Sequence, residues 1–212
     1  MKKTFLDDIV FYSKLLHQNG FVSATDGNIS IRYNKGFLVT PSGFPKREVK
    51  KNDIVKIDLK GNPLSAKAPS SEIKMHLAIY KTRNDVKAVV HAHPPFATAL
   101  SLIDEDFENI PLSEFFITLQ KVKKVGYFEP GSEKLALEVA KCFKSKETRA
   151  VVLKNHGAVT VGNSLKSAFY RMESLEHSSK IYFLAKLIGN PKSFDKELKS
   201  RLIQIGKNYG LK

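Results

Sequence analysis

The stretch Ala88-Val89-Val90-His91-Ala92-His93-Pro94 decides the fold, because a short apolar run there leads into two closely spaced histidines. Its β-branched residues predict a buried strand, which Pro94 ends because proline cannot donate to a β-ladder. Successive side chains of a strand point to opposite faces, so His91 and His93 point to the same side. Two imidazoles side by side at the end of a buried strand form half of a metal site.

A third histidine follows a second apolar run. Ala150-Val151-Val152-Leu153 predicts another strand, and Asn155-His156-Gly157 predicts a tight turn directly after it. Neutral imidazole is a good ligand for Zn²⁺, and three histidines with an open position form the arrangement of catalytic zinc sites. A carboxylate from Glu72 would complete such a metal centre and could also act as its acid or base.

Three stretches of small polar residues offer donors for an anion. Backbone N–H and hydroxyl groups in such stretches suit an anion, and a helix N-terminus adds a favourable dipole. Together these donors would suit a phosphate monoester. The stretches are Gly27-Asn28, Ser42-Gly43 and Ser70-Ser71.

The periodicity of the remaining chain predicts a mixture of helices and short strands. Helices are expected over residues 3–19, 70–82, 96–102, 133–144, 165–188 and 195–206. Strands are expected over residues 29–33, 37–40, 55–59, 85–93, 151–153 and 158–161. Ser70 or Ser71 is the expected N-cap of the second helix, and residues 115–125 fit no single element.

This element order predicts an α/β fold with a mixed, mostly antiparallel sheet. The sequence holds neither G-x-G-x-x-G nor G-x-x-x-x-G-K-[ST], so a doubly wound nucleotide fold is not expected. With 212 residues, 42% of them hydrophobic, we expect one domain over residues 1–212.

Composition also indicates the cellular compartment of the protein. Cys142 is the sole cysteine, so no intramolecular disulfide is possible, as is usual in a reducing cytosol. No segment approaches 18 consecutive apolar residues, and the acidic pair Asp7-Asp8 interrupts the N-terminal region. We therefore expect a cytoplasmic protein without a signal peptide or a membrane span.

A formal net charge of +14 invites a nucleic-acid hypothesis. The lysines are scattered as pairs, however, and no basic run is interleaved with aromatic residues. We therefore expect a lysine-rich solvated surface and no nucleic-acid partner, with some of the positive charge attracting an anionic substrate.

Five motifs, taken together, resemble the class II aldolase/adducin superfamily, and most closely its L-fuculose-1-phosphate aldolases. The resemblance runs from about residue 5 to residue 188, and the motifs occur in the order seen in that family. They are Gly27-Asn28-Ile29-Ser30, Thr40-Pro41-Ser42-Gly43, Ser70-Ser71-Glu72, Val90-His91-Ala92-His93-Pro94 and Asn155-His156-Gly157.

The resemblance implies a three-layer α/β/α subunit, usually in a C4 homotetramer with the sites between neighbouring subunits. It implies one Zn²⁺ per subunit on His91, His93 and His156, with Glu72 as the metal's neighbour and proton-transfer residue. The implied reaction is the reversible cleavage of a ketose 1-phosphate to dihydroxyacetone phosphate and a small aldehyde such as lactaldehyde. The residues implied to hold the phosphate are Gly27, Asn28, Ser42, Gly43, Ser70 and Ser71.

One part of the chain departs from the family pattern. The fuculose-phosphate enzymes have a proton-donating tyrosine shortly after an Ile-Pro pair, whereas Phe115 follows Ile110-Pro111 here. Tyr209 resembles a tail tyrosine that closes over the site in those enzymes, and Tyr127 is a weaker candidate. The sequence therefore leaves open which aldehyde is released: fuculose, rhamnulose, ribulose and 5-deoxyribulose 1-phosphates all fit.

Three other functions use similar scaffolds. Pentulose-5-phosphate 4-epimerases have an aspartate in place of Glu72. Methylthioribulose-1-phosphate dehydratases have Gly-His-Gly at the third ligand, where this chain has Asn155 before His156. Adducin-like binding domains lack the metal ligands. The presence of Glu72 and all three histidines favours the aldolase.

Overall fold

Seven strands form one mixed sheet in the computed structural model, which describes residues 4–103 and 105–209 apart from the side chain of Tyr209. Their order across the sheet is β3-β2-β1-β4-β7-β6-β5. Neighbouring strands are antiparallel except β5 and β6, which confirms the predicted sheet type. The strands are β1 (Asn28–Tyr33), β2 (Gly36–Val39), β3 (Val55–Asp58), β4 (Ala88–Ala92), β5 (Lys121–Val125), β6 (Thr148–Leu153) and β7 (Gly157–Gly162).

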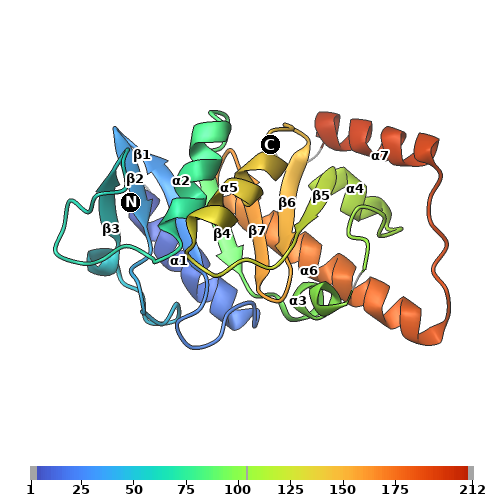
Figure 1. Cartoon of the computed structure of the whole chain (residues 1–212), viewed down its shortest axis with the longest axis horizontal. Coiled ribbons are helices and arrows are strands. Elements are labelled where there is room, and N and C mark those ends of the chain that lie inside the picture. The colour runs from blue at the N-terminus through green and yellow to red at the C-terminus, as the bar shows by residue number, and fades with distance from the viewer. Residues whose placement is uncertain (1–3, 104, 210–212) are drawn as a thin grey trace.

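Helices cover both faces of this sheet, which gives the three-layer α/β/α arrangement (Figure 1). On one face, α2 (Ile73–Thr82) and α5 (Glu133–Cys142) pack against each other and the sheet. The remaining α-helices belong to the core on the other face. They are α1 (Phe5–Gln18), α3 (Pro95–Leu102), α4 (Ser113–Leu119), α6 (Leu165–Ile188) and α7 (Lys196–Tyr209); a short 3₁₀ helix, η1, spans Lys51–Asp53.

The central strand β4 is buried along its whole length between β1 and β7. Its alternation separates the two cores: Ala88, Val90 and Ala92 face α1 and α6, whereas Val89 faces α2 and α5. His91 shares the face of Val89 and therefore lies in the layer of α2. The strand thus carries its histidine toward the residues that precede α2.

Three segments differ from the sequence-based expectation. Residues 115–125, which fitted no single element, form the end of α4 and the edge strand β5. The helix expected from Ser70 begins at Ile73, and its N-cap is Glu72 rather than Ser70 or Ser71. The Ser70 carbonyl accepts from the backbone N–H of Ile73 at 3.1 Å, so a turn precedes the helix and frees the Glu72 side chain. The last helix also extends beyond residue 206 to Tyr209.

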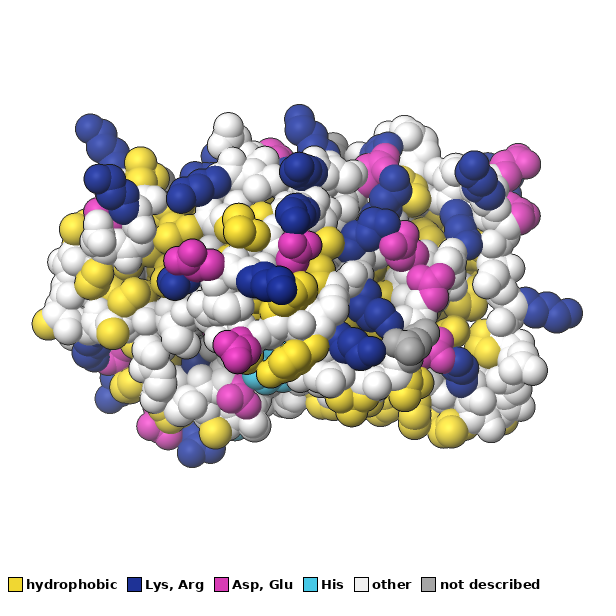
Figure 2. Space-filling model, in the orientation of Figure 1, with side chains coloured by type: hydrophobic (Ala, Val, Ile, Leu, Met, Phe, Trp, Pro, Cys, Tyr) yellow, Lys and Arg dark blue, Asp and Glu magenta, His cyan; other side chains and the backbone are white. Residues whose placement is uncertain are grey.

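Basic side chains are spread across the face seen in Figure 2 and are interspersed with acidic ones. Several of the lysines form ion pairs with nearby carboxylates, among them Lys123 with Glu108 and Lys141 with Glu138. Within the described part of the chain, no helix has both the length and the apolar character needed to cross a membrane.

A buried carboxylate ties the long helix α6 to the segment after β4. Both oxygens of Glu176 accept hydrogen bonds from the first turn of α3, from the backbone N–H groups of Phe96 and Ala97, each at 2.9 Å. These N–H groups have no intrahelical partner, so the carboxylate satisfies them and complements the helix dipole. The contact therefore holds in place the segment that follows His93.

We expect Glu176→Ala to lower the free energy of unfolding by about 2–4 kcal/mol, because two buried N–H groups lose a charged acceptor. Urea denaturation measures the loss. The matched control is Glu173→Ala on the same helix, where a half-buried carboxylate accepts one bond from the Asn19 side chain at 2.8 Å. The control should lose about 1 kcal/mol or less. Equal losses in the two variants would contradict the capping role.

Candidate metal centre and adjoining pocket

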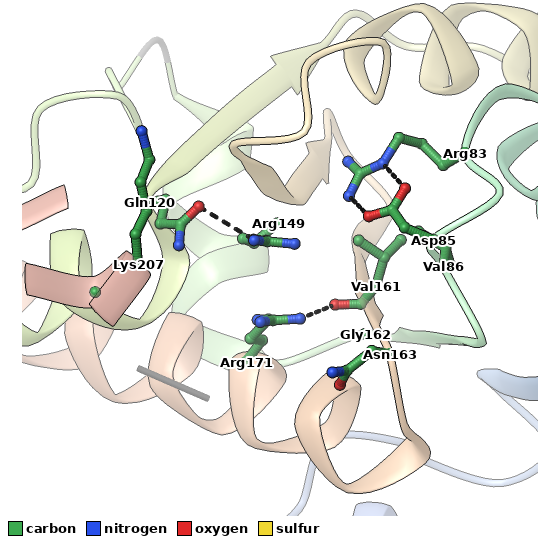
Figure 3. Close-up of a pocket in the computed structure, with 11 residues that line it drawn as sticks. Arg83, Asp85, Val86, Gln120, Arg149, Val161, Gly162, Asn163, Arg171 and Lys207 are labelled. Carbon is green, nitrogen blue, oxygen red and sulfur yellow. Dashed lines mark hydrogen bonds and ion pairs between the residues drawn. The ribbon is translucent and has the colours of Figure 1, made fainter. Parts of the chain in front are cut away.

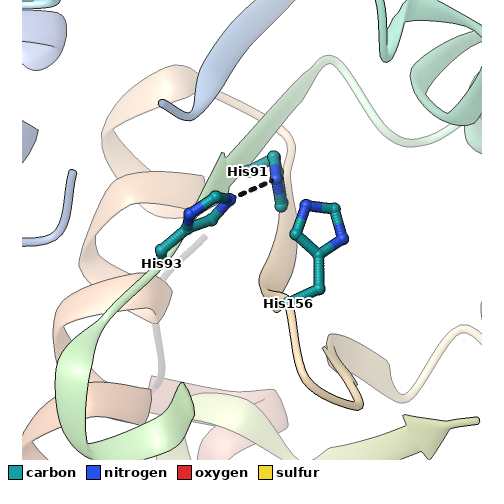
Figure 4. A group of neighbouring side chains, drawn as sticks. All are labelled: His91, His93 and His156. Atoms are coloured by element: carbon teal, nitrogen blue, oxygen red, sulfur yellow. Dashed lines mark hydrogen bonds between the residues drawn. The ribbon is translucent and has the colours of Figure 1, made fainter. Parts of the chain in front are cut away.

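Three histidines converge at one end of the central strands (Figure 4). His91 lies on β4 opposite Val159 of β7, and His93 follows the end of β4. His156 lies in the turn between β6 and β7, where Asn155 adopts a left-handed conformation with φ of 57°. The pairing of β4 with β7 therefore brings His156 close to His93 and His91, which lie 63 and 65 positions earlier in the sequence.

The three imidazoles are close enough to share one ion. One nitrogen from each ring lies within 4.8 Å of the others. The Nε2 atoms of His91 and His93 are 3.1 Å apart, and the centroids of the His91 and His156 rings are 4.8 Å apart. The predicted histidine cluster therefore forms in this structure.

Glu72 meets the cluster from the loop before α2. One carboxylate oxygen, Oε2, lies 2.9 Å from Nε2 of His91 and accepts a hydrogen bond of 3.0 Å from the side-chain amide of Asn28. The other oxygen, Oε1, lies 3.5 Å from Nε2 of His156. Only 8% of the surface of Glu72 is exposed, so the groups around it must offset the cost of burying its negative charge.

Neighbouring groups orient the imidazoles. Nδ1 of His91 lies 3.0 Å from the carbonyl of Ala158, to which it donates its proton, so Nε2 faces the cluster. Nδ1 of His93 lies 3.8 Å from a carboxylate oxygen of Asp26. These outer contacts leave Nε2 of His91 and Nε2 of His93 facing the centre of the cluster.

The pKa values of the cluster's members shift in different directions. Burial and the nearby His91 lower the pKa of both His93 and His156 to about 4, so both rings are neutral near pH 7. Burial alone would raise the pKa of Glu72, but His91 and His156 hold it well below its usual range. Burial lowers the pKa of His91, yet the adjacent Glu72 outweighs this and raises it.

The residues present fit a divalent cation. Three imidazole nitrogens and one carboxylate are available, and Oε1 of Glu72 has no hydrogen-bond partner among the described residues although it is buried. A buried carboxylate oxygen facing a cluster of ring nitrogens is the situation that a metal ion resolves.

A pocket of about 440 Å³ opens directly beside the cluster. Glu72, His93 and His156 line one side of it, and His91 lies fully buried behind them. All six residues predicted to hold a phosphate line the same pocket. They are Gly27, Asn28, Ser42, Gly43, Ser70 and Ser71.

Two glycines allow the backbone to form this pocket. Gly27 has φ of 69°, and a Cβ added there would lie 2.5 Å from Val22 Cγ1 and 2.9 Å from the carbonyl of His91. Gly43 has φ of 61°, in the left-handed region that glycine adopts without strain. Both positions therefore need glycine if their N–H groups are to face a ligand.

Neither of the predicted tyrosines is among the described residues that line the pocket. Tyr209 ends α7, but its side chain lies outside the described part of the chain. Tyr127 is 57% exposed and is not among the described residues of the lining. Phe115, which follows Ile110-Pro111, belongs to α4 and is fully buried in the core. His76, which the sequence did not assign to the site, is buried with Nδ1 2.7 Å from the hydroxyl of Ser30.

Comparison with known proteins identifies related chains. The family described as "Class II Aldolase and Adducin N-terminal domain" matches residues 7–183. An L-fuculose phosphate aldolase of Methanocaldococcus jannaschii is 37% identical over 82% of this chain and 92% of its own length. A 5-deoxy-D-ribulose 1-phosphate aldolase of Bacillus thuringiensis is 33% identical over 96% of each chain.

A third relative is named for a different reaction. A 3-oxo-tetronate 4-phosphate decarboxylase of Haemophilus influenzae is 32% identical over 82% of this chain and 85% of its own. Among solved structures, one of an L-fuculose 1-phosphate aldolase superimposes with a TM-score of 0.85 at 32% identity, covering 98% of both chains.

Two residues that the sequence did not indicate support the pocket. Asp26 lines it beside His93, within the turn that precedes Gly27. Lys46 is 1% exposed, and its ammonium donates to the carbonyls of Thr25 at 2.9 Å and Phe44 at 2.8 Å. Lys46 therefore joins the two loops that carry Gly27 and Gly43. A buried lysine gives no periodic signal, which is why sequence reasoning missed it.

Burial lowers the pKa of Lys46 from 10.5 to about 8, although Asp26 opposes the shift. Between these two values the unfolded chain binds more protons than the folded one, so stability rises with pH. We therefore expect the free energy of unfolding of the wild type to increase relative to that of Lys46→Met between pH 8 and 10.5. Urea denaturation at stepped pH measures the difference.

The control for this pH series is Lys35→Met, which removes an exposed lysine at the turn between β1 and β2. Its stability difference from the wild type should stay level over the same range. A level difference for Lys46→Met as well would show that the Lys46 pKa is not lowered.

Proposed function

Because the chain belongs to the class II aldolase and adducin family, we propose that it is a zinc-dependent aldolase that reversibly cleaves a ketose 1-phosphate to dihydroxyacetone phosphate and a small aldehyde. One observation carries the proposal. A single pocket joins the Glu72 and histidine cluster to the three polar stretches that suit a phosphate. That juxtaposition matches a substrate with a phosphate two atoms from a reactive carbonyl.

We assign one Zn²⁺ to His91, His93 and His156, with Glu72 beside it. The three ring nitrogens within 4.8 Å of one another support this assignment, as does the preference of zinc for imidazole ligands. A bound Zn²⁺ supplies Lewis acidity to the oxygens next to the bond that breaks.

The polar stretches of the pocket position the substrate's phosphate. The backbone N–H groups at Gly27 and Gly43 and the hydroxyls of Ser42, Ser70 and Ser71 act as its donors. Holding the phosphate fixes the distance between the substrate's carbonyl and the histidines, which replaces a diffusional encounter by a defined geometry.

Glu72 transfers the proton in this proposal. The Glu72 carboxylate accepts the proton of the hydroxyl on the aldehyde side, the carbon–carbon bond breaks, and its electron pair stays on the ketone fragment. Oε1 of Glu72 then delivers a proton to that carbon and gives dihydroxyacetone phosphate. The position of Oε1 beside the pocket, without a hydrogen-bond partner among described residues, supports this role.

The decarboxylase relative gives the second candidate reaction. Loss of CO₂ from a 3-oxo-tetronate 4-phosphate leaves the same ketone fragment as aldol cleavage, so one pocket suits both. The two reactions differ in the group released, an aldehyde or CO₂. Dehydratase or epimerase activity would instead keep the carbon chain of the substrate intact.

We also propose that this single domain acts in the cytoplasm as a homotetramer with its sites between subunits. Exposed apolar side chains on the last turns of α6, Leu187 at 70% and Ile188 at 88%, support association with another copy. Light scattering in solution tests the assembly.

We expect His93→Ala to lose stoichiometric zinc, because one of three ring ligands disappears. Inductively coupled plasma analysis of protein purified without chelators measures the metal. His177→Ala, an exposed histidine on α6, is the matched control and should retain one zinc per chain. Full zinc occupancy in His93→Ala would refute the ligand assignment. Absence of zinc from the wild type would refute the zinc dependence.

We expect Glu72→Gln to keep zinc but to lower the rate of cleavage by about 10²–10⁴-fold, because an amide cannot transfer the proton. The assay supplies zinc-loaded protein with dihydroxyacetone phosphate and a panel of aldehydes, and scores the condensation products and their stereochemistry. Glu133→Gln is the control, since that carboxylate is exposed and outside the pocket lining. Near-normal turnover in Glu72→Gln would exclude it as the proton-transfer group.

The same assay tests the proposed reaction itself. Condensation with at least one aldehyde is expected, and the preferred aldehyde identifies the substrate. A parallel arm measures CO₂ released from 3-oxo-tetronate 4-phosphate. Release of CO₂ without any condensation product would replace the aldolase by the decarboxylase.

A further inference from the structure

Within the part of its lining that the structure describes, the histidine pocket beside His93 and His156 has no lysine or arginine to balance a phosphate. The lining does contain two carboxylates, Asp26 and Glu72. The pKa values of His93 and His156 are about 4, so neither imidazole is charged near pH 7. A zinc ion would offset the charge of Glu72, yet a phosphate monoester brings nearly two further negative charges. A positive charge from outside the lining would therefore favour its binding.

Three arginines line a separate pocket at the opposite end of the central strands (Figure 3): Arg83, Arg149 and Arg171. Gly162, which lies opposite the first residue of β4, belongs to that lining, whereas His93 follows the last residue of β4. The two pockets share no described lining residue. These arginines therefore do not contact a ligand of the histidine pocket.

A buried ammonium group lies against the backbone of two loops of the histidine pocket. Lys46 is 1% exposed, and its Nζ atom donates to the carbonyls of Thr25 at 2.9 Å and Phe44 at 2.8 Å. Thr25 itself lines the pocket, and Phe44 directly follows Gly43, another lining residue. The ammonium is therefore within hydrogen-bond distance of both loops, although Lys46 is not among the described lining residues.

The hydrogen-bond partners of this ammonium are neutral. Both bonds end on backbone carbonyls, and no carboxylate of the described residues forms an ion pair with Lys46. Asp26 attracts Lys46 from a longer distance, but its carboxylate is 41% exposed and also accepts from the hydroxyl of Ser23 at 2.8 Å. Burial lowers the pKa of Lys46 to about 8, so the ammonium keeps its proton at pH 7. A positive charge without a direct counter-ion therefore lies close to the loops.

A buried charge acts over a longer range than an exposed one. Salt screens exposed charges over about 8 Å at physiological ionic strength, whereas a charge surrounded by protein is screened much less. The ammonium of Lys67 lies 5.8 Å from the centre of the Phe44 ring, but Lys67 is half exposed and pairs with Asp53. Lys46, by contrast, can stabilise an anion bound at the loops without touching it.

We propose that Lys46 is a specificity-determining residue of the histidine pocket, where its buried charge favours a substrate group with two negative charges. The carbonyls of Thr25 and Phe44 hold the ammonium in place, and the ammonium in turn joins the loops that carry Gly27 and Gly43. Coulomb energy is proportional to the charge of the ligand. A dianion therefore gains about twice as much from Lys46 as a monoanion of the same shape.

This inference rests on the proposed function only through the phosphate of the substrate. Aldol cleavage of a ketose 1-phosphate and decarboxylation of a 3-oxo-tetronate 4-phosphate both leave dihydroxyacetone phosphate. The same ligand therefore tests the role of Lys46 whichever of the two reactions the protein catalyses.

The test measures the affinity of zinc-loaded protein for two ligands of similar shape but different charge. Dihydroxyacetone phosphate is nearly a dianion at pH 7, because the second pKa of a phosphate monoester is about 6. Dihydroxyacetone sulfate, the corresponding sulfate monoester, has a single negative charge. Isothermal titration calorimetry at pH 7 and constant ionic strength gives both dissociation constants. Their ratio is the readout, because a purely structural change in the loops weakens both ligands alike.

Four variants are compared with the wild type: Lys46→Met, Lys46→Gln, Lys46→Arg and the control Lys35→Met. The methionine removes both the charge and the hydrogen bonds to the two loops. The glutamine keeps an N–H donor without the charge, and the arginine keeps the charge. Lys35 is exposed at the turn between β1 and β2, so its variant matches the loss of one positive charge. Circular dichroism and zinc content identify the variants that retain the folded site.

We expect the wild type and Lys35→Met to prefer the phosphate ester over the sulfate ester by the same factor. That factor should fall about tenfold in Lys46→Met and Lys46→Gln, because the dianion loses more attraction than the monoanion. Lys46→Arg should keep most of the preference, since its charge is retained.

A wild-type preference in Lys46→Gln would overturn the proposal, because the ammonium would then only join the loops. This variant and Lys46→Arg decide the question even if Lys46→Met does not fold. Binding of both esters with an unchanged ratio would remove the role of Lys46 and leave the proposed function intact. Failure of the wild type to bind either ester would overturn this proposal together with the proposed phosphate site.

Discussion

The contact between Glu72 and the histidines is the constraint on which the site depends. The Glu72 carboxylate lies 2.9 Å from Nε2 of His91 and 3.5 Å from Nε2 of His156, and it accepts a hydrogen bond from Asn28. It therefore contacts residues of β1, β4 and the turn between β6 and β7. A carboxylate that is only 8% exposed would be costly without these partners. One side chain therefore fixes the loop before α2, the strands β1 and β4, and the turn between β6 and β7 relative to one another.

Backbone geometry allows this contact to form. A Cβ on Gly157 would lie 2.4 Å from the carbonyl of Ala92, so only glycine lets the turn carrying His156 approach the end of β4. Gly27 has the same role on the other side, where an added Cβ would lie 2.9 Å from the His91 carbonyl. Small residues beside the histidines thus give the large polar groups room to converge. The chemistry of the site therefore requires close packing of its backbone.

The sequence predicts the parts of this arrangement that repeat or alternate. An apolar run fixed β4, alternation placed His91 and His93 on one side, and small polar residues marked the loops of the pocket. Other features depend on tertiary contacts that no local pattern records. The edge strand β5 was missed because its lysines mask the alternation of a half-exposed strand, and Lys46 was missed because two distant carbonyls define its role. The start of α2 was misplaced because Ser70 forms a turn instead of a cap.

The two ends of the central strands differ in how their charged side chains are paired. At the histidine end, a carboxylate and neutral imidazoles are arranged so that a cation completes the balance. At the other end, Arg83 forms a bidentate ion pair with Asp85, and Lys121 and Lys207 form ion pairs with Glu147. The described lining of the histidine pocket contains no lysine or arginine, so the cation proposed beside Glu72 would supply the counter-charge there.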